Sequence, residues 1–504
     1  MTSKPSICLF NTLSRKKEAF VPIETEKVKL YTCGPTVYDY AHIGNFRAFL
    51  FEDLLKRWLI YRGFKVTHIM NLTDIDDKTI KGSQKQGIPL KDFTDFYVKA
   101  FFEDIKALNI QPADVYPKAT DHIPEMIQLI KSLIAKGIAY KGEDGSIYFS
   151  VCKFPDYGKL SHIKVDELKA GARVCQDEYA KEEAQDFALW KAWTPEDGDV
   201  FWETELGKGR PGWHIECSAM SSKYLGSTFD IHGGGKDLIF PHHENEIAQS
   251  EAAFGKIFAR YWVHNGFVNV NQEKMSKSLG NFFTIREVYE RYQPEVLRLF
   301  LLTSHYRSPV DFSSESMAEA ERGLERFYQT IEQVSELAGD LSSSRELPSS
   351  EDPEFNSLRN KIESLVTRFQ NDMDDDFNTA AALGQLFDLC RALNRFQDSR
   401  SRKPTPEEKK LLAQGVHRLL ECANVLGLLQ RSPEEFFREH RRMSLATLGI
   451  GQEEVEGLIA ERAQARKEKN WARADEIRDK LAEMSISLED KPEGTRWRVK
   501  TVSA

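Results

Sequence analysis

The chain has 504 residues, which is enough for three or four domains and for several buried cores without disulfide bonds. Its hydrophobic fraction of 41% and charged fraction of 29% are those of a folded globular protein and exclude general disorder. The 69 basic and 78 acidic residues give a net charge of −9, which excludes a basic nucleic-acid-binding surface over the whole molecule, so any such contact must be local.

The apolar stretches and the cysteines indicate where the protein works. No apolar stretch approaches the roughly 20 residues that span a bilayer, and the N-terminus lacks a signal-peptide layout. The seven cysteines are scattered without a CxxC pair, which indicates a reducing compartment with free or metal-bound thiols. We therefore expect a cytoplasmic enzyme with no membrane partner.

The first part of the chain alternates strands with a helix. Residues 28–33 predict a buried strand, and apolar side chains at three- and four-residue spacing predict a helix over 44–63. Residues 65–71 predict a second strand. This βαβ unit implies a parallel sheet, with ligands bound at the carboxyl ends of its strands.

The alternation resumes at 227–232 and 261–270, after helical pieces and short strands such as 146–151. From about residue 284 the pattern is helical, with loops expected at 342–353 and 399–406. Near the C-terminus, apolar residues at helical spacing, Trp471 among them, are followed by alternating residues that predict a hairpin.

These elements predict an α/β fold. We expect a Rossmann-like parallel-sheet catalytic domain with an insertion, an α-helical bundle and a small C-terminal α+β module. The expected boundaries are 1–120 and 206–270 for the two halves of the catalytic domain, 121–205 for the insertion, 271–330 for a lysine loop and connecting region, 331–450 for the bundle and 451–504 for the module.

The segment Lys-Met-Ser-Lys-Ser at 274–278 is the most specific pattern in the chain. Two lysines in a loop with Ser and Gly can close on polyphosphate and neutralise charge that develops during displacement at phosphorus. A solvated surface loop is the usual alternative, but a chance match to all five residue types is expected in fewer than about one in a thousand sequences. Lys274 and Lys277 are therefore candidate catalytic residues.

The loop before the first helix is a candidate phosphate site. Thr36, His42, Gly44 and Asn45 lie there, and the unpaired amides and dipole at a helix N-terminus suit a triphosphate. A histidine at that position is more often a helix cap or a core contact. No GxxxxGK[ST] segment occurs, and no GxGxxG follows the first strand.

His242 and Glu246 are the basis of a candidate metal site. They are i and i+4 on a helix expected to start at Pro241 and end at Gly255, so they share a face. One imidazole and one carboxylate can form half of a tetrahedral zinc site, with thiolates supplying the rest. The spacing does not show which thiolates meet them, and a solvated helix face is the alternative. Two neighbours are expected to point elsewhere: His243 and Glu244.

Together these segments resemble a known family. His42-Ile43-Gly44-Asn45 and residues 274–278 resemble the two signature motifs of class I aminoacyl-tRNA synthetases. Within that class, residues 33–39, 209–218 and 240–246 are similar to the cysteinyl-tRNA synthetase family, and the resemblance runs from about residue 7 to residue 500. It departs at Asn45, where the class has histidine; asparagine can still donate a hydrogen bond to phosphate, but without charge.

The resemblance implies a cysteine–tRNA ligase. Such an enzyme forms cysteinyl-adenylate and pyrophosphate from L-cysteine and ATP, then transfers cysteine to the 3′-terminal ribose of cysteine tRNA. The resemblance also implies ATP with Mg²⁺, and one Zn²⁺ per chain held by Cys33, Cys217, His242 and Glu246. A thiophilic metal would favour cysteine over serine far more than a hydrophobic pocket could.

The resemblance assigns further roles. Catalytic contacts to the phosphates fall to His42, Asn45, Lys274 and Lys277, and ATP binding to Thr36, His42, Gly44, Asn45 and Lys277. The cysteine substrate would meet Cys33, Thr73 and Trp213, although core packing explains Trp213 nearly as well. We also expect the chain to be a monomer.

The helical C-terminal half would bind the tRNA. Basic residues cluster near the end of the chain, at Arg462, Arg466, Lys467, Lys469 and Arg473, and Arg496 and Arg498 flank Trp497. Such a mixture suits phosphate contacts and stacking on unpaired anticodon bases. An amphipathic helix with a solvated charged face is the alternative.

Two competing functions stay open at this point. A related ligase could pass activated cysteine to a small amine, although such enzymes resemble only the catalytic part of the chain. A non-catalytic RNA-binding or zinc-binding protein is the other alternative, but it would have no need of the lysine loop.

Overall fold

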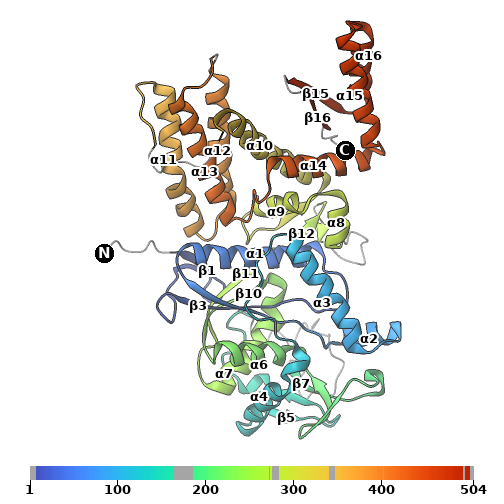
Figure 1. The fold of residues 1–504 in the computed structure, drawn as a ribbon. Coiled ribbons are helices and arrows are strands. Elements are labelled where there is room, and N and C mark those ends of the chain that lie inside the picture. The colour runs from blue at the N-terminus through green and yellow to red at the C-terminus, as the bar shows by residue number, and fades with distance from the viewer. Residues whose placement is uncertain are drawn as a thin grey trace.

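The computed structural model describes residues 7–163, 186–271, 273–274, 283–339, 347–400, 402–491 and 494–499. The long helix α1 (Ile43–Tyr61) runs across the middle of the molecule (Figure 1). Helices of the C-terminal half lie on one side of α1, and the central sheet and the insertion lie on the other (Figure 1).

The central sheet has four strands in the order β11-β10-β3-β4, and every neighbouring pair is parallel. Its strands are β3 (Lys27–Thr32), β4 (Lys65–Met70), β10 (Phe229–Gly235) and β11 (Ala259–Asn265). The predicted α/β class is therefore confirmed. Parallel strands bring their carboxyl ends to one edge, which is where ligands bind in such sheets.

Helix α1 fulfils the sequence prediction and explains why so much of it is apolar. Phe46, Leu54 and Trp58 are almost completely buried, as are polar residues on its other faces, such as Asp53. The buried Arg298, on helix α9 (Pro294–Leu302), donates to Asp53 Oδ2 at 2.5 Å. The helix is covered on both sides, so it is a buried core helix rather than a surface helix.

The insertion carries helix α4 (Ile123–Ala135) and a five-stranded antiparallel sheet in the order β5-β6-β7-β9-β8. Its strands are β5 (Ala139–Lys141), β6 (Ile147–Phe149), β7 (Phe187–Ala192), β8 (Trp202–Thr204) and β9 (Gly207–Pro211). The sheet thus continues past the expected boundary at residue 205. Strand β9 escaped prediction because it is rich in glycine; a Cβ on Gly209 would lie 2.1 Å from the backbone oxygen of Lys191.

The strand predicted over 261–270 is wrong as a single element. Strand β11 ends at Asn265, and β12 (Val268–Val270) pairs instead with β13 (Glu273–Lys274) and β14 (Val310–Phe312). Gly266 separates the two strands, because a Cβ there would lie 2.5 Å from the backbone oxygen of Ser308. The chain therefore turns out of the central sheet just before the lysine loop.

Several shorter elements complete the catalytic region. They are β1 (Cys8–Asn11), β2 (Lys16–Ala19), α2 (Asp77–Gln86), α3 (Leu90–Ala107), α6 (Trp213–Leu225), α7 (Glu244–Phe254), α8 (Ile285–Arg291) and α9 (Pro294–Leu302). Single-turn helices lie at Ala119–His122, Val151–Lys153, Pro195–Asp197, Lys236–Leu238 and Ile239–His243.

Long helices dominate the C-terminal half, as predicted. They are α10 (Ser314–Ala338), α11 (Pro353–Asp374), α12 (Thr379–Asp398), α13 (Pro406–Val425) and α14 (Pro433–Leu448). Three of them, α11, α13 and α14, begin at a proline preceded by a capping Asp, Thr or Ser, the usual chemistry of a helix start. No described helix is both long and apolar enough to cross a membrane.

The C-terminal module has its own small core. It consists of α15 (Gln452–Lys467), α16 (Trp471–Glu483) and the predicted hairpin of β15 (Ile486–Lys491) with β16 (Gly494–Val499). Val455, Ile477 and Leu481 pack in this core, but Trp471 is 59% exposed. Trp471 is therefore a surface residue, although its helical spacing with apolar residues suggested a place in the core.

Candidate active site

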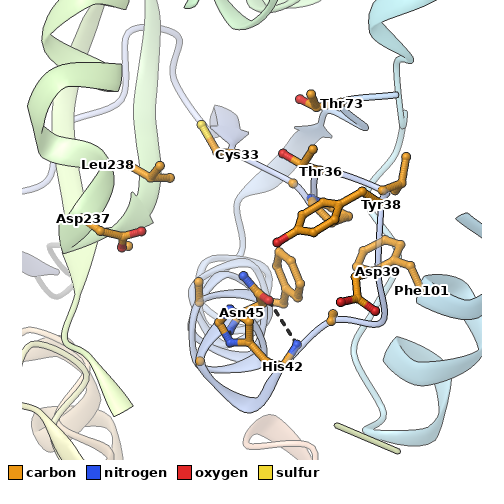
Figure 2. A pocket seen from close by; sticks show the side chains of 18 of the residues that line it. Cys33, Thr36, Tyr38, Asp39, His42, Asn45, Thr73, Phe101, Asp237 and Leu238 are labelled. Carbon is orange, nitrogen blue, oxygen red and sulfur yellow. Dashed lines mark hydrogen bonds between the residues drawn. The ribbon is translucent and has the colours of Figure 1, made fainter. Parts of the chain in front are cut away.

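A cavity of about 400 Å³ opens at the carboxyl ends of the central strands (Figure 2). The loop between β3 and α1 forms one wall, and residues 235–238 with 265–268 form another. In Figure 2, Cys33 and Thr73 lie at one end of the cavity and His42 and Asn45 at the other. Two of the candidate metal ligands, Cys33 and His242, thus line the same cavity as the candidate phosphate site.

The loop from Cys33 to the start of α1 is held against the end of β4. The amide of Val37 donates to the Thr73 oxygen at 3.1 Å, and the amide of Thr73 donates to the Pro35 oxygen at 3.1 Å. Gly34 approaches so closely that a Cβ would lie 1.9 Å from the Asn71 backbone oxygen. These contacts place Thr36 and Thr73 together on the cavity wall.

His42 and Asn45 cap the N-terminus of α1 reciprocally. The Asn45 amide donates to His42 Nδ1 at 3.2 Å, and the His42 amide donates to Asn45 Oδ1 at 3.1 Å (Figure 2). The capping role is therefore compatible with the candidate phosphate role. Because Nδ1 accepts a hydrogen bond, the ring proton lies on Nε2, the nitrogen that can donate to an anion at the helix N-terminus.

Four candidate metal ligands converge from four different elements. Their ligand atoms all lie within 4.8 Å of one another: Cys33 after β3, Cys217 on α6, His242 in the turn before α7, and Glu246 on α7. The individual separations include 3.5 Å from Cys217 Sγ to His242 Nε2 and 3.0 Å from His242 Nε2 to Glu246 Oε1. Ligand atoms on a tetrahedral zinc ion lie about 3.3–3.8 Å apart, so this donor set fits such an ion.

The charges within this cluster favour cation binding. Burial raises the pKa of the Cys33 thiol well above its usual range, whereas hydrogen bonds from Cys33 and His242 overcome burial at Cys217 and bring its pKa to about 6. Burial opposes ionisation of Glu246, but His232 and His242 lower its pKa to about 2. Glu246 and Cys217 in turn overcome burial at His242 and raise its pKa to about 10, so a bound metal ion would take the place of the His242 proton.

Other histidines surround the ligands. His232 Nε2 lies 2.8 Å from Glu246 Oε2, and His214 Nδ1 lies 2.9 Å from His242 Nδ1. Such outer contacts orient the groups that bind a metal. An alternative set of four also meets the distance limits and shares two members with the first: Cys33, His232, His243 and Glu246. The set with two thiols is the better match to the preferences of zinc.

The expected helix around the metal ligands needs two corrections. The α-helix begins at Glu244, not at Pro241, because Phe240 has non-helical dihedral angles and residues 239–243 form a separate turn. His243 consequently does not point away: its Nε2 lies 3.3 Å from Cys33 Sγ, and its Nδ1 lies 2.8 Å from His264 Nε2. Glu244 does face elsewhere and accepts hydrogen bonds from backbone amides of residues 158–161.

Trp213 and Thr73 both line the cavity. The Trp213 ring stacks on His242 with centroids 4.2 Å apart, and Trp213 is only half-buried, so it is not an ordinary core residue. Thr73 Oγ1 donates to the buried Glu216 Oε2 at 3.1 Å and accepts from Asn71 Nδ2 at 3.1 Å. Trp213 thus contacts the metal ligand His242, and Thr73 lines the same cavity.

The lysine loop is only partly within the described residues. The backbone of Lys274 forms strand β13, and Lys277 lies outside the described residues. The chain re-enters beside the helix cap, where the Ile43 amide donates to the Phe283 oxygen at 3.2 Å and the Ile285 amide donates to the Ala41 oxygen at 2.9 Å. The far end of the loop is therefore anchored against the start of α1.

Comparison with known proteins identifies the family. Residues 19–322 match the family described as tRNA synthetases class I (C) catalytic domain. Residues 368–430 match the DALR domain, and residues 451–498 match the cysteinyl-tRNA ligase anticodon binding domain. A cysteine–tRNA ligase of Thermodesulfovibrio yellowstonii is 50% identical over 98% of this chain and 99% of its own length.

The chain belongs to the cysteine–tRNA ligase family. A cysteine–tRNA ligase of Geobacter metallireducens, also 50% identical, covers 98% of this chain and all of its own length. Among solved structures, a Mycobacterium tuberculosis methionyl-tRNA synthetase in complex with methionyl-adenylate aligns with a TM-score of 0.61 at 15% identity, over 85% of this chain and 94% of that one. The chain thus has the class I synthetase fold together with the domain set of cysteine–tRNA ligases.

Most of the basic residues noted near the C-terminus are paired within the protein. Arg462 and Arg466 bind Asp490, and Arg473 binds Glu461 and Glu476. Arg496 and Arg498 reach across to Glu332 on α10 at 3.3 and 3.0 Å, and Arg441 lies over the Trp497 ring. Sequence clustering therefore overstated the positive surface, since these arginines hold the module together and attach it to the bundle.

Sequence reasoning also missed part of the cavity wall. Lys78 on α2 lines the cavity, and its ammonium lies 5.1 Å above the Tyr38 ring. Tyr97 and Phe101 on α3 line the same side. A three- and four-residue spacing of aromatic side chains along 93–101 was available in the sequence as a sign of a common face.

Proposed function

We propose that the chain is a cysteine–tRNA ligase that activates L-cysteine with ATP and then transfers it to the 3′-terminal ribose of cysteine tRNA. The observation that supports this most strongly is 50% identity to cysteine–tRNA ligases over nearly the whole chain. The cavity adds a physical reason, because it joins a helix N-terminus suited to phosphate to a thiol-rich metal-ligand cluster. We further propose that the protein acts as a monomer in the cytoplasm.

We propose that Cys33, Cys217, His242 and Glu246 hold one zinc ion. The donor set of two thiols, an imidazole and a carboxylate fits zinc, and the separations of its atoms support that assignment. A zinc ion there would supply a soft acceptor for thiolate sulfur, which separates a thiol from a hydroxyl more sharply than shape alone. The role of the protein is to hold the four ligands in place and to exclude water around them.

The cavity geometry supports a division of labour around this centre. Trp213 and Thr73 would enclose the amino-acid side chain, because both line the cavity that Cys33 and His242 also line. Thr36, Gly44 and Asn45, with Nε2 of His42, would bind ATP phosphates at the positive end of α1. Lys274 and Lys277 would add charge from the adjacent loop, with Mg²⁺. Catalysis would come mainly from positioning and electrostatic stabilisation.

The C-terminal module would hold the anticodon end of the tRNA. Trp471 is 59% exposed at the turn between α15 and α16, beside Lys467 and Lys469. Neither lysine is ion-paired to any other residue in the described part of the chain. An exposed indole near two such cations in the sequence is suited to stacking on an unpaired base.

Pyrophosphate exchange tests the proposed function. Incubating the full chain with ATP, labelled pyrophosphate and each of the twenty amino acids in turn should give cysteine-dependent exchange, with serine far weaker. Charging of cysteine tRNA should follow. Exchange without charging, together with cysteine transfer to small amines, would favour the small-amine ligase, and the absence of exchange would favour a binding protein.

A further inference from the structure

The aromatic wall of the cavity continues outward to solvent. Tyr40 and Tyr97 line the cavity, with ring centroids 5.6 Å apart in an edge-to-face arrangement. The Phe96 ring packs against both, with centroids 6.1 Å from Tyr40 and 5.1 Å from Tyr97. Phe96 is nevertheless 56% exposed, so the wall ends in an apolar ring that faces water.

Two cations border these aromatic rings. The Arg286 guanidinium lies 4.7 Å from the Tyr40 ring centroid and is ion-paired to Asp104 at 2.9 Å. Lys78 is exposed above Tyr38, and none of the described carboxylates lies within 4.0 Å of its ammonium. Arg286 therefore stiffens the wall, whereas Lys78 leaves a positive charge beside the opening of the cavity.

We propose that this rim, defined as Tyr40, Phe96 and Tyr97 with Lys78, binds the unpaired nucleotides at the 3′ end of the tRNA. The inference rests on the proposed function, since transfer requires the 3′-terminal ribose to enter this cavity and the preceding nucleotides to cross its rim. Unpaired bases stack on aromatic side chains, and a lysine without a carboxylate partner neutralises a backbone phosphate. Phe96 is the stacking surface, and Lys78 is the phosphate contact.

The position of the rim agrees with this occupant. In Figure 1, α2 and α3 project on the same side of the molecule as α15, α16 and their hairpin. A single elongated ligand could therefore extend from the C-terminal module to the cavity along that side. A partner protein would account for an exposed phenylalanine, but not for its place beside the cavity together with an unpaired cation.

Variants of Phe96 separate this role from simple packing. Phe96→Ala should leave cysteine-dependent pyrophosphate exchange unchanged, because that reaction needs only ATP and cysteine. It should lower kcat/KM for tRNA charging by about tenfold, within the range of losses that stacking on one base produces. Phe96→Trp should restore charging, since an indole also presents a flat aromatic face. Ile257→Ala, at a site 58% exposed outside the cavity, is the matched control and should behave as the unaltered protein.

Lys78 provides an independent arm of the same experiment. Lys78→Met should lower charging severalfold and reduce its salt dependence, whereas Lys78→Arg should retain most of it. Lys81→Met, one turn along α2 and also exposed, should change neither reaction.

The outcomes are distinguishable from failure of the proposed function. An unaltered chain that makes adenylate but does not charge tRNA overturns the proposed function itself. If the unaltered chain charges tRNA and Phe96→Ala charges it equally well, the rim is not a tRNA contact. Equal loss of exchange and charging in Phe96→Ala, or a loss that Phe96→Trp does not restore, also overturns the inference.

Discussion

The metal-ligand cluster and the C-terminal module use charged residues in opposite ways. In the cluster, four ligand residues from three distant parts of the sequence meet within 4.8 Å, and all are buried. In the module, basic residues close together in sequence separate on folding, and most pair with nearby carboxylates, as Arg462 does with Asp490 at 2.8 Å. Charge density along the chain is therefore a poor guide to which charges stay unpaired at the surface, whereas the cluster gathers its donor atoms in one buried place.

The cluster should be the part of the molecule most sensitive to a single substitution. Cys217→Ser replaces a thiolate ligand by a hydroxyl, so bound zinc should fall and the KM for cysteine should rise. Changes to groups that only support metal ligands cost about 10- to 100-fold, so the loss in kcat/KM for cysteine-dependent exchange should exceed about 100-fold. Metal analysis and exchange kinetics measure the two effects.

Cys152→Ser is the control, because Cys152 is exposed and lies outside both metal-ligand sets. It should retain zinc and activity. Purified unaltered protein that is fully active without stoichiometric zinc would contradict the assignment of the cluster.

The lysine loop is expected to carry a third kind of charge, one that contacts phosphate mainly in the transition state. If Lys277 contacts phosphate mainly in the transition state, Lys277→Ala should slow adenylate formation by about 10²-fold while ATP binding changes little. Single-turnover kinetics at varied ATP concentration measures the rate of adenylate formation and the affinity for ATP separately. A weaker affinity for ATP with an unchanged rate at saturation would instead mean that the lysine binds the ground state.

In the C-terminal module, Trp471 should affect tRNA charging but not amino-acid activation. Trp471→Ala should reduce kcat/KM for charging by about tenfold, since one stacked base is lost, and should leave pyrophosphate exchange intact. Arg478→Ala is a control on the same helix, because Arg478 is exposed and paired to Asp475 and Asp479. An unchanged charging rate in Trp471→Ala would show that the exposed indole is not a base contact.

The predictions from sequence succeeded where local pattern determines structure. The spacing of Phe46, Leu54 and Trp58 was enough to locate α1, and alternation was enough to locate the hairpin of β15 and β16. They failed where tertiary contacts override local pattern. Strand β9 forms because glycines allow it to lie against β7, and His243 turns toward Cys33 because the chain at Phe240 is not helical.

The candidate site shows the same limit. The i,i+4 spacing of His242 and Glu246 was visible in the sequence, and the structure retains it with a separation of 3.0 Å. Their meeting with Cys33 and Cys217 could come only from the resemblance, because no local rule brings four elements together. The rim around Phe96 was missed for a related reason: helical spacing shows that aromatic residues share a face, but not that the face borders a cavity.

His440 differs from the exposed, paired charges of the C-terminal module, because it is a buried ion-paired group in the helical bundle. On α14 it lies 2.9 Å from Glu325 and 3.5 Å from Glu321, both on α10, and its ring also stacks near Phe436. Burial opposes its charge, but the two carboxylates raise its pKa to about 9. Because this value lies above that of an unfolded histidine, near 6.5, the stabilisation is complete below about pH 6.5 and is lost as the pH rises through 9.

The expected effect is the smallest of those considered, a decrease of a few degrees in the melting temperature of the C-terminal half between pH 7 and pH 9.5. His440→Gln keeps a polar side chain of similar size but cannot ionise, so it should melt lower at pH 7 and lose this part of the pH dependence. Thermal unfolding followed across that pH range, with the exposed Lys410→Gln variant as control, measures the difference. Identical pH profiles for His440→Gln and the unaltered protein would show that the ion pairs of α14 with α10 contribute nothing, and the bundle would then hold α14 by apolar packing alone.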